Sequence, residues 1–166
     1  EYILTQDVNN QSGFIWSNEK IDLNQPFDIE LGVYLGSNVG IDPGTGLDRG
    51  ADGMSFILQN DPRGTAAQGY IGGFMGVDGD INLSAYGYTD RAVYPSVTVE
   101  FDTFDNTFMG FTGDLAADHT AIYLNGDVAI PDAANTLKAA TSVGIGGEIE
   151  DGKYHLTRYI WNPTTQ

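Results

Sequence analysis

Short runs of β-forming residues dominate the pattern of apolar and polar positions along the chain. Apolar spacing of three and four residues, which marks an amphipathic helix, is hard to find anywhere, whereas alternating or continuous runs of β-formers recur between clusters of Gly, Asn, Asp and Pro. The predicted strands span residues 14–17, 27–36, 53–59, 96–104, 119–125, 141–146 and 154–161. The pattern therefore predicts an all-β fold.

The segments between the predicted strands have the composition of loops. Residues 37–50 are rich in Gly and Asp, so we expect an exposed loop there, and residues 60–68 have the same character. Residues 78–82 alternate oxygen-bearing side chains but lack the glycine and the distal Glu of a calcium-binding loop, so we expect a solvated turn. Only residues 133–140 look weakly helical, and they are short enough for a turn or a single helical coil.

The end of the chain leaves one predicted strand without an obvious partner. Residues 154–161 have the pattern of a strand, Asn162-Pro163 that of the turn after it, and the sequence then reaches Gln166 without a return strand. The partner either lies earlier in the chain or belongs to a separate segment.

Length and composition predict a single domain over residues 1–166, because this length buries one sizeable core but not two. Hydrophobic residues make up 41% of the chain and charged residues 18%, and there are 22 glycines, a profile that suits an all-β protein with many turns. The 23 acidic residues outnumber the seven basic ones, giving a net charge of −16. That charge argues against binding to a nucleic acid or an anionic membrane and favours neutral ligands and cations.

The chain contains no cysteine, so oxygen atoms and histidine must supply the ligands of any metal site. No apolar run approaches the roughly 18 residues of a membrane span, and no signal peptide opens the chain. We expect a protein without membrane insertion, from which any export signal has been removed.

The predicted strand at residues 96–104 carries the strongest chemical signal. Its alternation places Glu100 and Asp102 on one face, and the same alternation continues to Phe104 and Asn106. Two neighbouring carboxylates on one face are costly in a packed sandwich unless a cation lies between them, and hard divalent ions prefer such oxygen ligands.

The segment after this strand offers further ligands. Asp114, Asp118 and His119 precede or begin the next predicted strand, and a hairpin would bring them back over Asp102. The spacing favours one site of oxygen ligands suited to calcium and a second, including His119, suited to a transition ion such as manganese.

These residues resemble the legume-type, or L-type, lectins, and in particular their bacterial members. The resemblance lies in E-F-D-T-F-x-N, D-x-x-x-D-H and A-I-Y-L-N-G-D at residues 100–127, in A-D-G-M-S-F-I-L-Q at residues 51–59, and in G-G-F-M-G at residues 72–76. Residues 11–36 and 155–166 extend it over nearly the whole chain. It implies an antiparallel, concanavalin A-like β-sandwich of the jelly-roll type, and in this family further strands follow the region that resembles residues 161–166.

Carried over residue by residue, the resemblance implies two ion sites and a sugar site. The first ion, Ca²⁺, would be held by Asp102, the Phe104 carbonyl, Asn106 and Asp114. The second, Mn²⁺ or Ca²⁺, would be held by Glu100, Asp102, Asp114 and His119. Asp118 is the alternative to Asp114 as the ligand shared by the two ions. The saccharide would contact Asp52, Gly72, Gly73, Phe104 and Asn106. A cis peptide bond is implied between Ala51 and Asp52.

The sequence thus predicts a calcium-dependent, non-catalytic lectin on or outside the cell, with glycans of the mannose or glucose type as partners. A homo-oligomer, or a second chain or segment that completes the sheet, is also expected. Two alternatives remain. A glycoside hydrolase on the same fold would use Glu100, Asp102 and Asp105 in an E-x-D-x-x-E-like arrangement, although the second Glu is missing. An adhesion module of a larger surface protein would recognise a protein instead.

Overall fold

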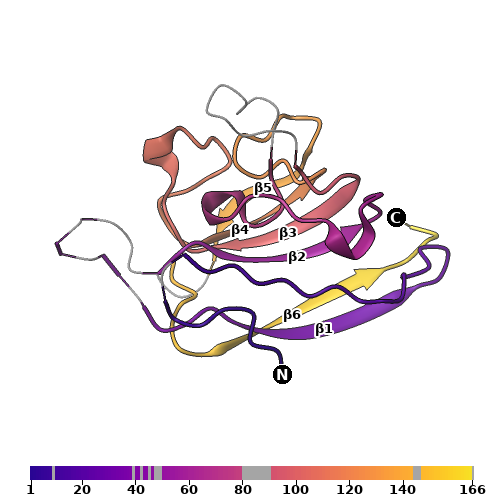
Figure 1. Ribbon diagram of the computed structural model, residues 1–166, viewed down its shortest axis with the longest axis horizontal. Helices are drawn as coiled ribbons and strands as arrows, with labels where there is room; N and C mark the ends of the chain where they lie inside the picture. The colour runs from indigo at the N-terminus through magenta and orange to yellow at the C-terminus, as the bar shows by residue number, and fades with distance from the viewer. Residues whose placement is uncertain are drawn as a thin grey trace.

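The protein is an antiparallel β-structure of two sheets, shown by a computed structural model that describes residues 1–8, 10–38, 40–41, 43–44, 46, 50–79, 91–143 and 147–165 (Figure 1). The smaller sheet pairs β1 (Phe27–Tyr34) with β6 (Tyr154–Trp161). The larger has the order β2-β3-β4-β5, with β2 at Gly53–Gln59, β3 at Ser96–Asp102, β4 at His119–Leu124 and β5 at Thr136–Ser142. Short 3₁₀ turns lie at Gly64–Ala66 (η1), Gly72–Phe74 (η2) and Thr107–Met109 (η4). The predicted all-β fold is confirmed.

Most predicted strands match the observed ones, and the differences have physical reasons. Residues 14–17 form no strand; the Trp16 indole instead donates to the Ala67 carbonyl at 3.1 Å. The weak helix predicted at residues 133–140 is wrong, because the chain there enters β5, which pairs with β4 across a bulge. The strand predicted at 141–146 therefore begins and ends earlier than expected, and residues 144–146 lie outside the described part of the chain.

The strand that ends the chain finds its partner near the beginning. β6 pairs antiparallel with β1 over its whole length, from Phe27 opposite Trp161 to Tyr34 opposite Tyr154. Of the two sources considered for this partner, the structure shows the one earlier in the chain.

The two faces of the four-stranded sheet are covered by different parts of the chain. One face looks toward the β1–β6 sheet, where Phe56 stacks on Tyr159 with ring centroids 3.8 Å apart. The other face lies under the connecting segments, and Ala121 and Tyr123 of β4 pack there with loop residues. The buried members of that cluster are Ala67, Val77, Val93, Ala121, Tyr123 and Val128. The loops are therefore anchored to the sheet by an apolar core of their own.

Polar residues of β3 point into this loop-covered side. Ser96, Thr98, Glu100 and Asp102 alternate as buried positions along the strand, while the residues between them are half-buried. The predicted placement of Glu100 and Asp102 on one face is confirmed. Two carboxyls thus lie in the interior, beneath the segment that joins β3 to β4.

Two loop predictions have different outcomes. The described residues of the 37–50 loop lie outside the strands and are mostly exposed, although Gly50 is buried. The solvated turn predicted at 78–82 is wrong at its start, since Asp78 is fully buried and its carboxylate accepts N–H groups from Gly79, Val128 and Ala129. Residues 80–82 lie outside the described part. No helix within the described ranges has the length and apolarity needed to cross a membrane.

Candidate functional site

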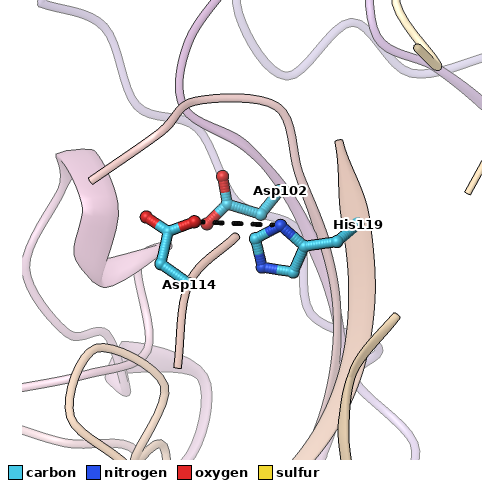
Figure 2. Close-up of side chains that lie close together, drawn as sticks. All are labelled: Asp102, Asp114 and His119. Carbon is cyan, nitrogen blue, oxygen red and sulfur yellow. Dashed lines mark ion pairs between the residues drawn. The ribbon is translucent and has the colours of Figure 1, made fainter. Parts of the chain in front are cut away.

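Antiparallel pairing of β3 and β4 brings the chemically important residues together. Asp102, the last residue of β3, lies directly opposite His119, the first residue of β4. The connecting segment folds back so that Asp114 points at the same place, as Figure 2 shows. One ligand atom from each of these three side chains lies within 4.8 Å of the others. Residues from separate stretches of the sequence thus form one compact group.

Glu100 extends the group along β3. The His119 ring lies between two carboxylates, with Nε2 3.6 Å from Glu100 Oε1 and Nδ1 3.8 Å from Asp114 Oδ1. These separations are too long for hydrogen bonds. Nδ1 lies 3.2 Å from the Ala117 carbonyl, while the buried Nε2 has no hydrogen-bond partner. The imidazole therefore has a nitrogen atom available toward Glu100.

The protonation of the group reflects its burial. Burial raises the pKa of Asp102 to about 8, and the nearby charges of Asp114 and Glu100 add to the increase. Burial also raises the pKa values of Glu100 and Asp114. For His119, burial alone lowers the pKa, but the carboxylates of Glu100, Asp102 and Asp114 more than offset this effect and hold the pKa above its usual value. Three buried carboxyls around one imidazole require protons or a cation for charge balance.

Asn106 ties the connecting segment to this group. Its backbone N–H donates to Asp114 Oδ2 at 2.5 Å, and the N–H of Phe104 donates to Asp102 Oδ1 at 2.9 Å. The Asn106 side chain is buried, and its Oδ1 has no hydrogen-bond partner. An unpartnered buried acceptor is costly. The Asn106 backbone is bonded to Asp114, and an amide oxygen is a suitable ligand for a hard cation.

The structure separates the two candidates for the shared acidic ligand. Asp114 lies in the group with Asp102 and His119. Asp118 is buried elsewhere, and its Oδ2 accepts the N–H of Ile149 at 2.5 Å. Asp118 therefore holds the segment that leads toward β6 and is absent from the three-residue group.

A second group of residues with expected roles lies next to Asn106. Asp52 precedes β2, follows a cis peptide bond from Ala51, and accepts the N–H of Thr103 through its backbone carbonyl at 2.9 Å. A Cβ added at Gly72 would lie 3.9 Å from the Asp52 carboxylate, and one added at Gly73 would lie 2.7 Å from Asn106 Oδ1. Only glycine fits at the latter position. The β2 entrance, the η2 turn and the segment after β3 thus converge.

The Asp52 carboxyl is half-buried, and burial raises its pKa. Together with the Asn106 amide and the Gly73 backbone, it forms a small set of polar groups beside the carboxylate group. Such a set, with one acceptor and an amide that both donates and accepts, suits a polyhydroxylated ligand. The residues expected to bind a saccharide are therefore neighbours in space.

Two aromatic residues, Phe104 and Phe108, lie in the same connecting segment as Asn106. Phe104 is half-buried, and its ring centroid lies 6.4 Å from that of Phe108, with the ring planes inclined at 71°. Phe108 and Met109 are 62% and 60% exposed. The sequence analysis did not single out these two residues. The sequence does contain a signal for them, because this apolar pair lies between two predicted metal ligands, Asn106 and Asp114.

The residue types and their burial fit the binding of a metal ion. Glu100 and Asp102 are 2% and 5% exposed and lie under the connecting segment, whereas the two carboxyls of a glycoside hydrolase flank the scissile bond of the substrate. Divalent ions would give partners to the buried Asn106 Oδ1 and His119 Nε2 and would balance the carboxylates. The geometry therefore favours binding chemistry at this end of the sheet.

Comparison with known protein families gives the same assignment. The family model of the legume lectin beta-barrel domain, the L-type lectin domain, matches residues 1–166. Domains of this family are non-catalytic and bind metal ions, and membership suggests carbohydrate binding. With this match over the full printed sequence and the two-sheet fold, the chain belongs to the L-type lectin domain family.

Proposed function

We propose that the protein is a calcium-dependent lectin that binds glycans on or outside the cell. The observation that carries the proposal is the convergence of Asp52, Gly73 and Asn106 beside the buried group of Asp102, Asp114 and His119. Asn106 belongs to both groups. An ion at the carboxylates would therefore act directly on a residue that contacts the ligand.

Calcium has the ligand chemistry that this group offers. Asp102, Asn106, Asp114 and the Phe104 carbonyl would supply oxygen ligands to Ca²⁺. Glu100 and His119 would complete a second site with Asp102 and Asp114, suited to Mn²⁺ or a second Ca²⁺. Ion binding would displace the proton that the raised pKa of Asp102 favours, and it would fix the segment that carries Phe104 and Asn106.

The saccharide would be held by groups that match its hydroxyls and its apolar face. The Asp52 carboxylate would accept hydrogen bonds from two adjacent hydroxyls, and the Asn106 amide would exchange hydrogen bonds with another. The backbone N–H of Gly73 would donate to the sugar, with Gly72 allowing close approach. The ring of Phe104 would cover the C–H patch of the pyranose. Glycans of the mannose or glucose type are the proposed partners.

The smaller sheet bears on the proposed assembly. β1 and β6 form only a two-stranded sheet within the described part of the chain, and Leu31, which lies on its inner face opposite Thr157, is 39% exposed. We propose that a further segment or a second chain extends this sheet and covers the apolar surface. The second chain can be another copy of this protein, which would give a homo-oligomer. An extracellular location is consistent with the use of calcium and with glycan binding.

The experiment is a glycan array probed with wild-type protein in calcium and in chelator, together with Asp52→Ala. Binding that requires calcium and is lost in Asp52→Ala supports the proposal. Asp28→Ala, a change at an exposed carboxylate of β1 paired with Arg158, is the matched control and should retain binding. A silent array despite measurable calcium binding would favour a protein ligand. Release of reducing ends from mixed polysaccharides, lost in Glu100→Gln, would favour hydrolysis.

A further inference from the structure

The backbone that leads into Asp52 lies against a buried glutamate from a distant part of the chain. Glu150 is 5% exposed, and Gly50 is buried as well. A Cβ atom added at Gly50 would lie 1.6 Å from Glu150 Oε1 and 2.0 Å from its Cδ and Oε2. The Glu150 carboxyl group therefore packs directly on the Gly50 backbone, two residues before the carboxylate that is proposed to bind the sugar.

Gly50 has no room for a side chain at this contact. Because a separation of 1.6 Å is far below van der Waals contact, any larger residue would have to displace the Glu150 carboxyl group. Such a displacement is costly, since a buried carboxyl group depends on the polar contacts that replace its solvation. The fit between Gly50 and Glu150 thus fixes the point at which the chain enters Ala51 and Asp52.

Two hydrogen bonds anchor the segment that carries Glu150 to the start of β4. The N–H of Asp118 donates to the Gly147 carbonyl at 3.0 Å, and the N–H of Ile149 donates to Asp118 Oδ2 at 2.5 Å. The Asp118 side chain is itself buried. Glu150 therefore approaches Gly50 from a backbone whose position is set by the four-stranded sheet.

The segment after β3 supports the same backbone from its other end. The Asp52 carbonyl accepts the N–H of Thr103 at 2.9 Å, directly before β2 begins at Gly53. Only Ala51, which is exposed, separates Asp52 from the contact at Gly50. A shift of the Gly50 backbone would therefore move the Asp52 carboxylate, and binding groups need to be held to about 0.5 Å by the residues that support them.

We propose that Glu150 is a positioning residue for Asp52 and thereby sets the affinity of the sugar site. This inference rests on the proposed lectin function and deepens it. Glu150 acts through the Gly50 backbone, and it lies outside the group of Asp102, Asp114 and His119. Its removal should weaken saccharide binding and leave calcium affinity unchanged. This separation distinguishes a positioning residue from a metal ligand and from a residue that supports only the stability of the fold.

The test measures two affinities by calorimetry: that of calcium, and that of a methyl glycoside in the presence of calcium. The glycoside is the one that binds wild-type protein best among mannose, glucose, galactose and N-acetylglucosamine. The variants are Glu150→Ala, Glu150→Gln, Gly50→Ala, the double variant of Gly50→Ala with Glu150→Ala, and Asp52→Ala. Asp61→Ala controls for the loss of a buried carboxylate, because Asp61 is 7% exposed and follows β2 at the end opposite Asp52. Circular dichroism verifies that each variant is folded.

We expect Glu150→Ala to weaken the glycoside by about three- to tenfold, the scale of one lost hydrogen bond, and to leave calcium affinity unchanged. Gly50→Ala should cause a similar loss, because its methyl group displaces the carboxyl group. Glu150→Gln keeps the length of the side chain and should lose less than Glu150→Ala, and Asp61→Ala should keep wild-type affinity. The double variant should lose no more than Glu150→Ala alone, since the methyl group then occupies vacated space.

Four results would overturn the inference: wild-type glycoside affinity in Glu150→Ala, a parallel fall in its calcium affinity, an equal loss in Asp61→Ala, or losses that multiply in the double variant. The lectin proposal stands in each of these cases if wild-type protein binds the glycoside and Asp52→Ala does not. Absence of binding by wild-type protein to every methyl glycoside refutes both.

Discussion

Replacing Asp102 by Asn tests two effects of this carboxyl: it destabilises the ion-free fold, and it is a proposed ligand of calcium. Asp102 is 5% exposed, and its pKa is raised from 3.8 to about 8. At pH 7 this difference corresponds to about 4 kcal/mol by which the carboxyl destabilises the ion-free fold. An asparagine keeps a carbonyl oxygen to accept the N–H of Phe104 and carries no charge. We expect it to recover about 1–3 kcal/mol, because the amide is still a buried polar group.

The same substitution should remove the response to calcium. An ion that binds only the folded protein stabilises it by about 2.7 kcal/mol at a hundredfold excess over its Kd. For a domain of this size, 1 kcal/mol corresponds to about 2–4 °C in Tm. Wild-type protein should therefore gain about 5–10 °C when calcium replaces chelator. Asp102→Asn should start about 2–12 °C above wild type in chelator and gain almost nothing from calcium.

The assay is thermal unfolding followed by circular dichroism in chelator and in a calcium series. Asp28→Asn is the matched control, since Asp28 is half exposed in an ion pair of a kind that contributes little to stability. It should shift neither the Tm in chelator nor the calcium response by more than about 1 °C. The reasoning is refuted if Asp102→Asn lowers the Tm in chelator and still gains as much from calcium as wild type.

Three further predictions concern the same region. In chelator, the stability contributed by the protonated Asp102 is fully present below its ordinary pKa of 3.8 and is lost as the pH rises through about 8; the raised pKa of His119 acts in the same direction. The Tm in chelator should therefore fall between pH 5 and pH 8. A Tm that does not change over this range would contradict the prediction. Asp114→Ala should abolish the calcium-induced rise in Tm. Asp118→Ala leaves the Ile149 N–H without its acceptor, so it should cost about 1–3 kcal/mol of stability and retain that rise. The opposite result would make Asp118 the ion ligand and Asp114 the structural residue. Gly73→Ala places a methyl group 2.7 Å from Asn106 Oδ1 and should weaken sugar binding at least tenfold in calorimetry, with unchanged affinity counting against the assigned contact.

Strand prediction succeeded where alternation was regular. Residues 53–59 and 154–161 match β2 and β6, and the alternation around Glu100 and Asp102 gave the correct face. It failed at residues 133–140, where small residues with weak preferences were placed in β5 by pairing with β4. It also failed at 14–17, because a β-like run is not a strand without a partner.

The candidate site was predictable in membership but not in detail. The sequence pattern predicted a hairpin that returns over Asp102, and the structure adds the register in which His119 lies opposite it. The choice between Asp114 and Asp118 depends on which carboxylate accepts the Ile149 N–H, a long-range contact with no local signal. The buried Asp78 likewise depends on N–H groups about 50 residues away, at Val128 and Ala129. Spacing along the chain does not encode such contacts.

The most direct test of the ion-dependent site is a crystal structure of the protein grown in calcium, with anomalous scattering used to locate the ion. The account predicts a peak about 2.3–2.6 Å from oxygen atoms of Asp102, Asn106 and Asp114. Density that shows these oxygens directed into bulk solvent, with no peak among them at millimolar calcium, would contradict it.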